Sequence, residues 1–428
     1  MYNDQNYDLI VIGGGPAGST VATLVAEHGH RVLLLEREAE PKFKIGESLI
    51  PATYWTFKRL GMLEKLRASH FPQKYSVQFY SRTGKASSPF YFFQTNPHES
   101  AVTWQVLRSE FDEMLLDNAK EKGVEVVHGV SVREVLFEGD TATGVVVQAA
   151  NRSRETLNAT VIVDSTGQRS LIGKQLNLNT TEPNLKMASL FTHYEGGHRD
   201  DGIDEGATLI LHTETKDSWF WSIPLPYDRT SIGVVGELDY LLQNRRDANG
   251  RLDAQQIFTE ELSKCTPLQQ RLEGAKQLFP IQSTKDFSYR ASRIAGNHWV
   301  LVGDAFGFLD PVYSTGLFLA LKSGEMAADT IIEAFRKDDF SEEQLGSFGP
   351  EFVKGMEAFR KLVYAFYTKE FSFARFLSQY PEHQGGIVDI LSGDVFRKDV
   401  THIFPAMAEM CPFPPEMPLA NSVGRGRA

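Results

Sequence analysis

Residues 7–36, YDLIVIGGGPAGSTVATLVAEHGHRVLLLE, decide the fold. The apolar runs at 7–12 and 31–36 each predict a buried strand, and the Ala-rich segment 16–28 between them predicts a helix. Two parallel strands need a crossover connection of about this length, and a helix is the usual one. The stretch therefore predicts an α/β fold built around a parallel sheet.

A glycine pattern occupies the turn between the first strand and the helix. Gly13, Gly15 and Gly18 form GxGxxG within GGGPAGS. In such a turn the first glycine allows the tight bend, the second lets a pyrophosphate approach the backbone, and the third lets helix and strand pack closely. The positive end of the helix favours the negative charge of the pyrophosphate. Glu36, at the end of the second strand, is placed to accept hydrogen bonds from ribose hydroxyls.

Strand, glycine turn, helix and acidic residue together predict a Rossmann-like dinucleotide site. A glycine-rich turn without a ligand is the alternative, and the presence of all four features in order speaks against it. The same turn and the end of the second strand supply three further candidate cofactor-binding residues: Pro16, Ala17 and Arg37.

The composition limits the other possibilities. The chain has 428 residues, enough for one large α/β core and a smaller attached region. Its net charge of −11, with no basic run, argues against nucleic acid as a partner. Cys265 and Cys411 lie far apart and lack metal-ligand spacing, so we expect neither a disulfide framework nor a metal site. The polar N-terminus and the lack of a long apolar run predict a cytoplasmic enzyme without a membrane span.

Further periodic segments complete the pattern. Residues 185–236 alternate apolar and polar positions, which predicts an antiparallel sheet with one covered face. From Trp299 the chain returns to strand, glycine turn and helix, and the last hundred residues are mostly helical in pattern. Other expected helices are 56–68 and 108–122, and other expected strands are 124–128, 145–148 and 159–164.

Three more stretches indicate which dinucleotide is bound. They are TWQVLRSEFDEML at 103–115, VDSTGQRS at 163–170 and LVGDAFGFLDP at 301–311. With the glycine turn, they resemble the FAD-binding motifs of the large family that includes aromatic hydroxylases, geranylgeranyl reductases and flavin-dependent halogenases. The resemblance implies that Gly303 and Asp304 hold the ribityl and phosphate region and that Arg108 contacts the flavin. The structural alternatives are a salt bridge within its own helix for Arg108 and a helix N-cap for Asp304.

The resemblance covers roughly residues 5–335 and implies a discontinuous FAD-binding module. We expect its core at about 5–80, 101–170 and 285–335, with an inserted antiparallel-sheet substrate region at about 81–100 and 171–284. A helical C-terminal region, 336–415, and a disordered tail, 416–428, would follow. No second GxGxxG follows another predicted strand. The flavin must therefore be reduced by transient NAD(P)H binding or, as we expect, by a separate flavin reductase.

The segment 217–225, DSWFWSIPL, indicates which subgroup of this large family the chain resembles. Trp219, Trp221, Ile223 and Pro224 match the WxWxIP signature of flavin-dependent halogenases. Because side chains alternate along a strand, both indoles would project from one face. The resemblance implies that they lie beside the flavin and keep the organic substrate away from it, which disfavours monooxygenation. The alternative is a strand with two core aromatics and an edge proline.

Two loops resemble halogenase elements as well. KIGESLIP, 44–51, resembles the loop over the flavin and adds Gly46, Glu47 and Ser48 as candidate cofactor contacts; its alternative is a simple turn entering a helix near Thr53. DPVYSTG, 310–316, resembles the loop that holds chloride against the flavin, with Pro311 and Gly316 as cofactor contacts. Its candidate halide-binding residues are Ser314, Thr315 and Gly316, whose amides and hydroxyls suit a small anion. A capped helix start is the alternative.

Lys74 corresponds by position and context to the active-site lysine of halogenases. We expect it to begin a strand with Lys74, Ser76, Gln78 and Tyr80 on one face and with Tyr75, Val77 and Phe79 on the other. The alternative is a surface lysine. The resemblance implies that this lysine either hydrogen-bonds hypohalous acid or forms a haloamine, which requires a neutral amine that burial would favour.

The implied activity is halogenation of an electron-rich aromatic ring with reduced FAD, O2 and chloride or bromide. Tryptophan halogenases carry a Glu immediately before the Ser-Thr-Gly of the chloride loop, whereas this chain has Tyr313. In that respect it resembles phenol and pyrrole halogenases, so we expect a phenolic or similar substrate, free or tethered to a carrier protein.

Three other readings share the FAD motifs. The first is a single-component FAD monooxygenase that hydroxylates a phenol, against which WxWxIP speaks. The second is a geranylgeranyl-reductase-like flavoprotein with a long apolar tunnel. The third is a flavin-binding regulator or a halogenase relic without catalysis.

Overall fold

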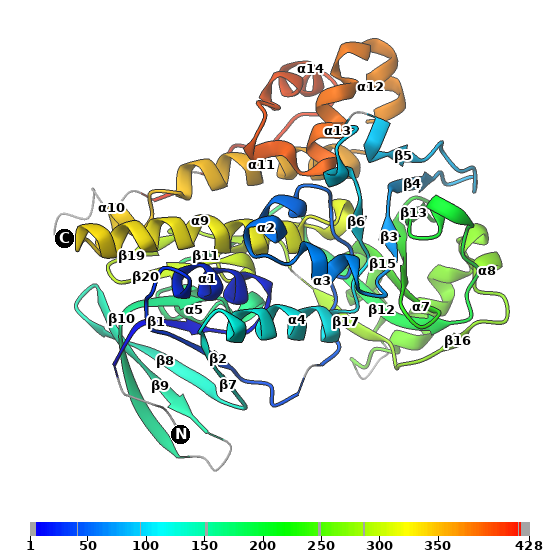
Figure 1. The fold of residues 1–428 in the computed structure, drawn as a ribbon. Helices are drawn as coiled ribbons and strands as arrows, with labels where there is room; N and C mark the ends of the chain where they lie inside the picture. The colour runs from blue at the N-terminus through cyan, green and yellow to red at the C-terminus, as the bar shows by residue number, and fades with distance from the viewer. Residues whose placement is uncertain are drawn as a thin grey trace.

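The computed structural model describes residues 6–40, 42–94, 96–149, 153–246, 250–285, 287–417 and 419–420. Its first sheet has the strand order β19-β20-β10-β1-β2-β7. Strands β20, β10, β1, β2 and β7 run parallel, and the strand pair β8–β9 extends the sheet from β10 as antiparallel neighbours (Figure 1). The strand bounds are β1 Asn6–Ile12, β2 Val32–Glu36, β7 Glu125–His128, β8 Ser131–Glu138, β9 Thr141–Gln148, β10 Arg154–Asp164, β19 Ala295–Gly296 and β20 Trp299–Leu301. The predicted α/β fold is confirmed.

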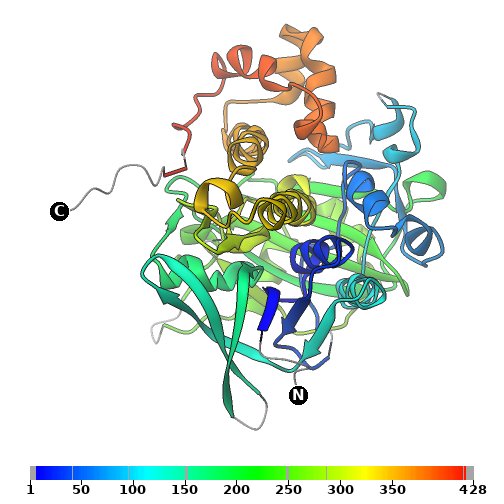
Figure 2. The same ribbon diagram turned by 60° about the vertical axis from the view of Figure 1, so that its left-hand side comes forward.

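One layer of helices covers this sheet. Helix α1 (Pro16–Ala26) is the predicted crossover and packs against α4 (Arg108–Glu121) and α9 (Gly316–Lys337). Figure 2 shows α4, α1 and α9 nearly end-on, in a row over the sheet, with α11 (Gly349–Tyr367) above α9. Gly324 permits the close approach of α9, because an added Cβ would lie 2.5 Å from the carbonyl oxygen of Ala17.

A second sheet stands beside the first, in the order β16-β12-β15-β14-β13-β4-β5, with β17 also paired to β12. Strands β12 to β15 are antiparallel neighbours, as the alternation at 185–236 predicts. The sheet is mixed, however, since β13 pairs with β4 in parallel. The bounds are β4 Ser76–Tyr80, β5 Phe90–Tyr91, β12 Met187–Glu195, β13 Thr208–His212, β14 Ser218–Leu225, β15 Arg229–Glu237, β16 Lys276–Gln277 and β17 Gln282–Lys285.

Both faces of the second sheet are covered, so the expectation of one covered face is wrong. On the face away from the first sheet, Phe220 and Val234 pack with Phe258 and Leu268 in a separate hydrophobic core. The covering side chains come from α7 (Ala254–Leu262) and α8 (Thr266–Arg271), which follow the sheet strands in sequence. These two helices were not predicted from the sequence, because they are short and amphipathic and carry many polar residues.

The predicted strand and helix near Lys74 are each divided in two. Lys74 ends the short strand β3 (Gln73–Lys74), which pairs with β6 (Thr103–Trp104), while β4 starts at Ser76 with a separate pairing to β5. The predicted alternation therefore does not run from Lys74 into β4. Residues 56–68 form α2 (Thr53–Arg59) and α3 (Leu63–Arg67), because Gly61 takes a φ of +70° that ends the first helix.

The C-terminal region is helical, as predicted, and α12 to α14 lie beyond α11 at the top of Figure 1. The predicted tail 416–428 is not free where it is described: Lys361 donates to Glu416 and the Ala420 amide donates to the Ser292 carbonyl. Residues 421–428 lie outside the described residues. The remaining bounds are α5 Leu171–Gln175, α6 Leu238–Leu241, α10 Glu342–Leu345, α12 Phe373–Gln379, α13 Gln384–Ser392, α14 Phe404–Ala408, β11 Asn179–Thr181, β18 Tyr289–Ala291 and β21 Gly307–Phe308.

None of the helices formed by the described residues combines the length and the apolar character that crossing a bilayer would require.

Candidate active site

A cavity of about 460 Å³ lies where the carboxyl ends of the parallel strands meet the second sheet. Ligands of open α/β sheets bind at this end of the strands. The cavity brings together most of the predicted site residues: Gly13, Gly15, Pro16, Ala17, Glu36, Arg37, Gly46, Glu47, Ser48, Arg108, Trp219, Trp221, Ile223, Gly303, Asp304, Pro311, Ser314 and Gly316. Four predicted residues do not line it: Gly18, Lys74, Pro224 and Thr315.

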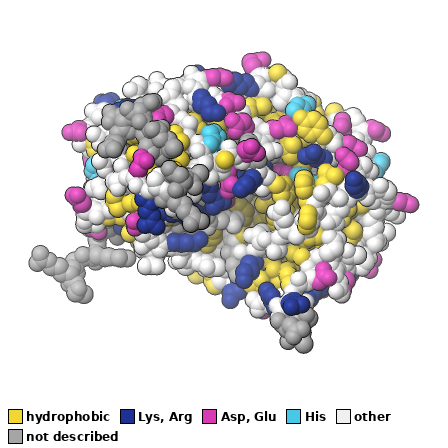
Figure 3. All heavy atoms as spheres, turned by 90° about the horizontal axis from the view of Figure 1, so that it is seen from below, with side chains coloured by type: hydrophobic (Ala, Val, Ile, Leu, Met, Phe, Trp, Pro, Cys, Tyr) yellow, Lys and Arg dark blue, Asp and Glu magenta, His cyan; other side chains and the backbone are white. Residues whose placement is uncertain are grey.

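Two basic residues that were not among the predicted ones, Lys44 and Arg169, also line the cavity, together with the predicted Arg37. Seen from below, the molecular surface is hollowed near its centre, and Lys and Arg side chains lie on both sides of the hollow (Figure 3). Positive charge around a cavity suits a ligand that carries phosphate groups.

The glycine turn fits a pyrophosphate. Gly13 has a φ of +110°, and a Cβ there would lie 2.6 Å from the Ser165 carbonyl oxygen. A Cβ at Gly18 would overlap the Gly13 carbonyl oxygen, so Gly18 serves helix–strand packing rather than lining the cavity. At Gly15 a Cβ would meet no atom within 4 Å. Its backbone therefore faces open space from which a phosphate can approach.

Glu36 is held by the backbone around it. Its Oε2 accepts from the Gly14 amide at 2.7 Å, and its Oε1 accepts from the Glu38 amide at 2.9 Å. An ionised carboxylate has about four acceptor positions, so acceptors remain for ribose hydroxyls. The residues present thus fit the adenosine and pyrophosphate part of FAD.

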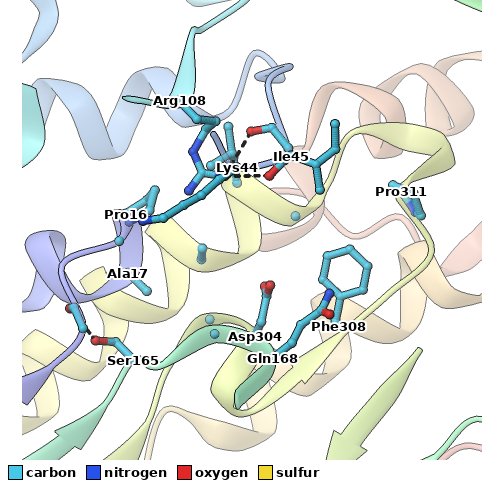
Figure 4. Close-up of a pocket in the computed structure, with 18 of the residues that line it drawn as sticks. Pro16, Ala17, Lys44, Ile45, Arg108, Ser165, Gln168, Asp304, Phe308 and Pro311 are labelled. Carbon is cyan, nitrogen blue, oxygen red and sulfur yellow. Dashed lines mark hydrogen bonds between the residues drawn. The ribbon is translucent and has the colours of Figure 1, made fainter. Parts of the chain in front are cut away.

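Arg108 begins α4 and is held against the 44–51 loop. Its Nε and Nη2 donate to Asp112 at 2.8 and 3.0 Å, so the alternative of a salt bridge within its helix is realised. Its Nη1 also donates to the carbonyls of Ile45 and Gly46 at 2.8 and 3.3 Å (Figure 4). One guanidinium therefore lines the cavity and holds the loop over it.

Asp304 lies in a short 3-10 turn after β20, and Figure 4 shows its carboxyl group directed into the space among the labelled residues. Burial raises the pKa of this carboxyl to about 6, while the charge of Arg108 opposes the rise. The N-cap alternative is wrong, because the following helix α9 has Thr315 at its N-cap position.

The tryptophan motif forms part of the cavity wall. Every residue of β14 is buried, and the ring centroids of Trp219 and Trp221 lie 6.3 Å apart. Trp221 Nε1 donates to Ser231 at 3.1 Å, and Gly233 opposite it leaves room for the ring. The two indoles share one face, as predicted.

Pro224 is tolerated because of its place in the register. The pairing of β14 with β13 ends at Ser222, while the pairing with β15 continues to Leu225. Pro224 therefore lies where β14 has become an edge strand on one side, and the missing N–H interrupts no ladder there. This part of the structural alternative is correct, although the indoles also face the cavity.

The 310–316 loop, which we call the DPVYSTG loop, places a helix start at the cavity. Ser314 has a φ of +56°, and α9 begins at Gly316. No side chain caps this helix, contrary to the capping alternative. The first amides of a helix have no partner within it, and they carry partial positive charge. Ser314 and Gly316 expose this helix start to the cavity, which suits a small anion.

Lys74 is fully buried, so the surface-lysine alternative is wrong. Its Nζ donates to Ser48 Oγ at 2.9 Å and to the Leu49 carbonyl at 3.0 Å, and it lies 5.7 Å from the centre of the Phe92 ring. Burial lowers the pKa of the Lys74 ammonium to about 7. Ser48 lines the cavity and also contacts Thr208, so a single residue lies between the cavity and Lys74.

Several buried partners were not predicted from the sequence. His193 Nε2 lies 2.8 Å from Glu47 Oε1, and Gln105 Nε2 donates to the Gly206 carbonyl and to Thr208. Tyr367 contacts Trp219. His193 and Gln105 lie in apolar–polar alternation and Tyr367 in a helical pattern, and nothing in these local patterns indicates partners a hundred or more residues away.

Comparisons with known proteins agree with this geometry. The FAD binding domain family matches residues 6–342. The chain is 28% identical over 428 residues to a 1H-pyrrole-2-carbonyl-(peptidyl-carrier protein) chlorinase of Pseudomonas fluorescens, covering 95% of this chain and 94% of the relative. It is 32% identical over 342 residues to the corresponding brominase of Pseudoalteromonas luteoviolacea, covering 79% and 80%.

The fold is also that of a solved halogenase. The myxobacterial chondrochloren halogenase superposes with a TM-score of 0.78 at 29% sequence identity, covering 97% of this chain and 100% of that one. The WxWxIP motif, the fit of the cavity to FAD and these similarities point to one family. The chain belongs to the flavin-dependent halogenases within the FAD binding domain family and is an FAD-dependent halogenase.

Proposed function

We propose that this halogenase modifies a phenolic ring with an oxidant that is handed over at Lys74. The observation that carries the proposal is the position of Lys74, fully buried and one serine away from the cavity. Reduced FAD, O2 and a halide supply hypohalous acid when bound. The DPVYSTG loop would hold the halide, and Trp219 and Trp221 would keep the organic ring away from the flavin.

Lys74 is suited to either form of the transfer. Its Nζ is held by two uncharged acceptors, Ser48 and the Leu49 carbonyl, and burial brings the pKa of the ammonium close to neutral. The ammonium form would donate a hydrogen bond to hypohalous acid. The neutral amine would form an N–halogen bond and release the oxygen as water. Ser48 and the Leu49 carbonyl, which accept from Nζ, would hold the amine in place in both cases.

Tyr313 supports an activated substrate. Its hydroxyl donates to the Leu362 carbonyl at 3.2 Å, and the residue is buried. No acid at this position assists Lys74, which favours a ring that is already electron-rich. A carrier-bound pyrrole is the second candidate, because the chlorinase that matches nearly this whole chain acts on such a substrate. A separate flavin reductase would deliver reduced FAD.

The test compares Lys74→Ala with the wild type and with Lys85→Ala, which replaces an exposed lysine. Each protein receives FAD reduced by an added flavin reductase, bromide, O2, and either a phenol or a pyrrole on a carrier protein. We expect Lys74→Ala to lose ring bromination while still brominating a scavenger of hypohalous acid, with FAD affinity unchanged. Ring bromination at the wild-type rate would refute the role of Lys74.

The same assay separates the hydroxylase alternative. Hydroxylated phenol in place of brominated product, with NAD(P)H oxidised by the protein alone, would identify a single-component monooxygenase. Preference for the carrier-bound pyrrole over free phenols would replace the phenolic assignment and leave the Lys74 mechanism intact.

A further inference from the structure

A chain of hydrogen bonds joins the tryptophan motif to the DPVYSTG loop through Tyr367. Trp219 Nε1 donates to the Tyr367 hydroxyl at 2.9 Å, and that hydroxyl donates to Asp310 Oδ2 at 2.9 Å. An indole N–H can only donate, so the hydroxyl must accept from Trp219 and direct its own proton toward Asp310. With Asp310 ionised, the bonds therefore run from Trp219 to Tyr367 and from Tyr367 to Asp310.

Asp310 connects Tyr367 to the backbone of the DPVYSTG loop. Its side chain is fully buried, and its Oδ1 accepts from the Val312 amide at 3.1 Å. Both carboxyl oxygens are thus occupied, one by Tyr367 and the other by the loop itself. Because Pro311, Ser314 and Gly316 line the cavity, a shift of Asp310 would displace the loop at the position where the halide would bind.

Trp219 borders two cavities, so its hydrogen bond to Tyr367 helps to define its position. Its indole borders the main cavity and also a second cavity of about 170 Å³, whose wall includes Tyr367. Trp219 thus lies between two cavities, although it is buried in the hydrophobic core. The Phe366 ring packs edge-on against the indole, with 5.9 Å between ring centroids, and the Tyr367 hydroxyl accepts the hydrogen bond of the indole N–H.

We propose that Tyr367 is a positioning residue that couples Trp219 to the DPVYSTG loop and so sets the halide affinity of the enzyme. The inference rests on the proposed function, since it needs a halide at that loop. Tyr367 is the last residue of α11 and lies beyond residues 6–342, which match the FAD binding domain family. The C-terminal helical region thereby takes part in the halide chemistry and not only in the shape of the molecule.

The test is Tyr367→Phe, which keeps the ring and removes both hydrogen bonds. The matched control is Tyr364→Phe on the same helix, which removes a buried hydroxyl that donates to Glu182 instead of to Asp310. For each protein we would measure the dissociation constant of oxidised FAD by flavin fluorescence. We would also measure the bromide concentration that gives half-maximal bromination of a scavenger. Loss of the two bonds at Tyr367 should raise that concentration about ten-fold or more, with FAD affinity within two-fold.

Two further measurements separate positioning from a general loss of structure. Trp219→Phe removes the indole N–H, so combining it with Tyr367→Phe should add little to the larger single effect, as expected for residues on one link. Hydrogen peroxide released per reduced flavin should rise in Tyr367→Phe and not in Tyr364→Phe. Equal effects of the two tyrosine variants, additive effects in the double variant, or an unchanged bromide requirement would overturn the inference.

These readouts also distinguish the inference from the proposed function. Scavenger bromination does not need Lys74, so a failed role of Lys74 leaves this test valid. Absence of bromide-dependent scavenger bromination in the wild type would refute both.

Discussion

Replacing Lys74 by Met should stabilise the protein at neutral pH. The structure buries an amine completely and provides two uncharged acceptors, Ser48 and the Leu49 carbonyl, to hold it. Met has nearly the length of Lys, carries no charge and fills irregular apolar space. The substitution therefore removes the cost of the buried charge and keeps most of the volume.

The magnitude follows from the pKa of Lys74, which burial lowers from 10.5 to about 7. Such a shift corresponds to roughly 5 kcal/mol against the charged form, of which about 4 kcal/mol applies at pH 7, where the folded amine is half protonated. The two hydrogen bonds lost in Lys74→Met offset about 2 kcal/mol. The net expectation is a gain of about 2 kcal/mol in the free energy of unfolding at pH 7.

The stability advantage of Lys74→Met over the wild type shrinks as the pH rises. Between pH 7 and 10.5 the unfolded chain holds a proton that the folded Lys74 has lost, so the wild type gains stability as pH rises through this window. At pH 9 the remaining penalty is about 2 kcal/mol, which the lost hydrogen bonds cancel. The advantage of Lys74→Met should therefore disappear by about pH 9.

Urea unfolding of the wild type, Lys74→Met and Lys85→Met at pH 7 and at pH 9 measures this difference. Lys85 is exposed, so its substitution should change the free energy of unfolding by nearly the same small amount at both pH values. If Lys74→Met were less stable than the wild type at pH 7, or if its advantage did not shrink between pH 7 and 9, the burial argument would be refuted.

Three other predictions concern binding and rate. Gly15→Ala should weaken FAD binding at least ten-fold in fluorescence titration without lowering the melting temperature. Gly18→Ala should lower the melting temperature, because its Cβ overlaps the Gly13 carbonyl oxygen. Equal melting temperatures for the two variants would contradict this. Arg108→Lys cannot reproduce the fork that holds Asp112 and two loop carbonyls, so its FAD affinity should fall about ten-fold; an unchanged dissociation constant would show that the loop is held otherwise. If a haloamine carries the halogen, ring halogenation should rise with pH up to about 7 and then level off, following the pKa of Lys74, while a rate that falls above pH 7 would assign the transfer to the ammonium.

The parts of the fold that could be predicted from the sequence depend on neighbouring residues. The β1–α1–β2 unit, the glycine turn and the alternation of β14 each occupy one continuous segment. Their hydrophobic period and turn residues can therefore be recognised from neighbouring positions alone. The same holds for the placement of Trp219 and Trp221 on one face. The cavity then unites motifs whose order along the chain follows from the family resemblance.

The errors have a common physical cause, which is pairing over long sequence distances. Nothing near Ser76 indicates that β4 will pair in parallel with β13, whose strand begins at Thr208. The break between Lys74 and Ser76 arises because β3 has β6 as its own partner. In the same way, His193 finds Glu47, and Tyr367 finds Trp219 and Asp310, through tertiary packing that no local pattern contains.

The position of Ser48 has a consequence for how much oxidant the enzyme wastes. This hydroxyl is part of the cavity wall and at the same time the hydrogen-bond acceptor of Lys74. If Lys74 accepts the oxidant as proposed, only the Ser48 side chain would lie between a molecule formed in the cavity and its acceptor. The fraction that escapes into bulk solvent would then depend on how fast transfer past Ser48 competes with loss through the mouth of the cavity. Fidelity in such a catalyst comes from geometry, without any need to bind a small neutral oxidant tightly.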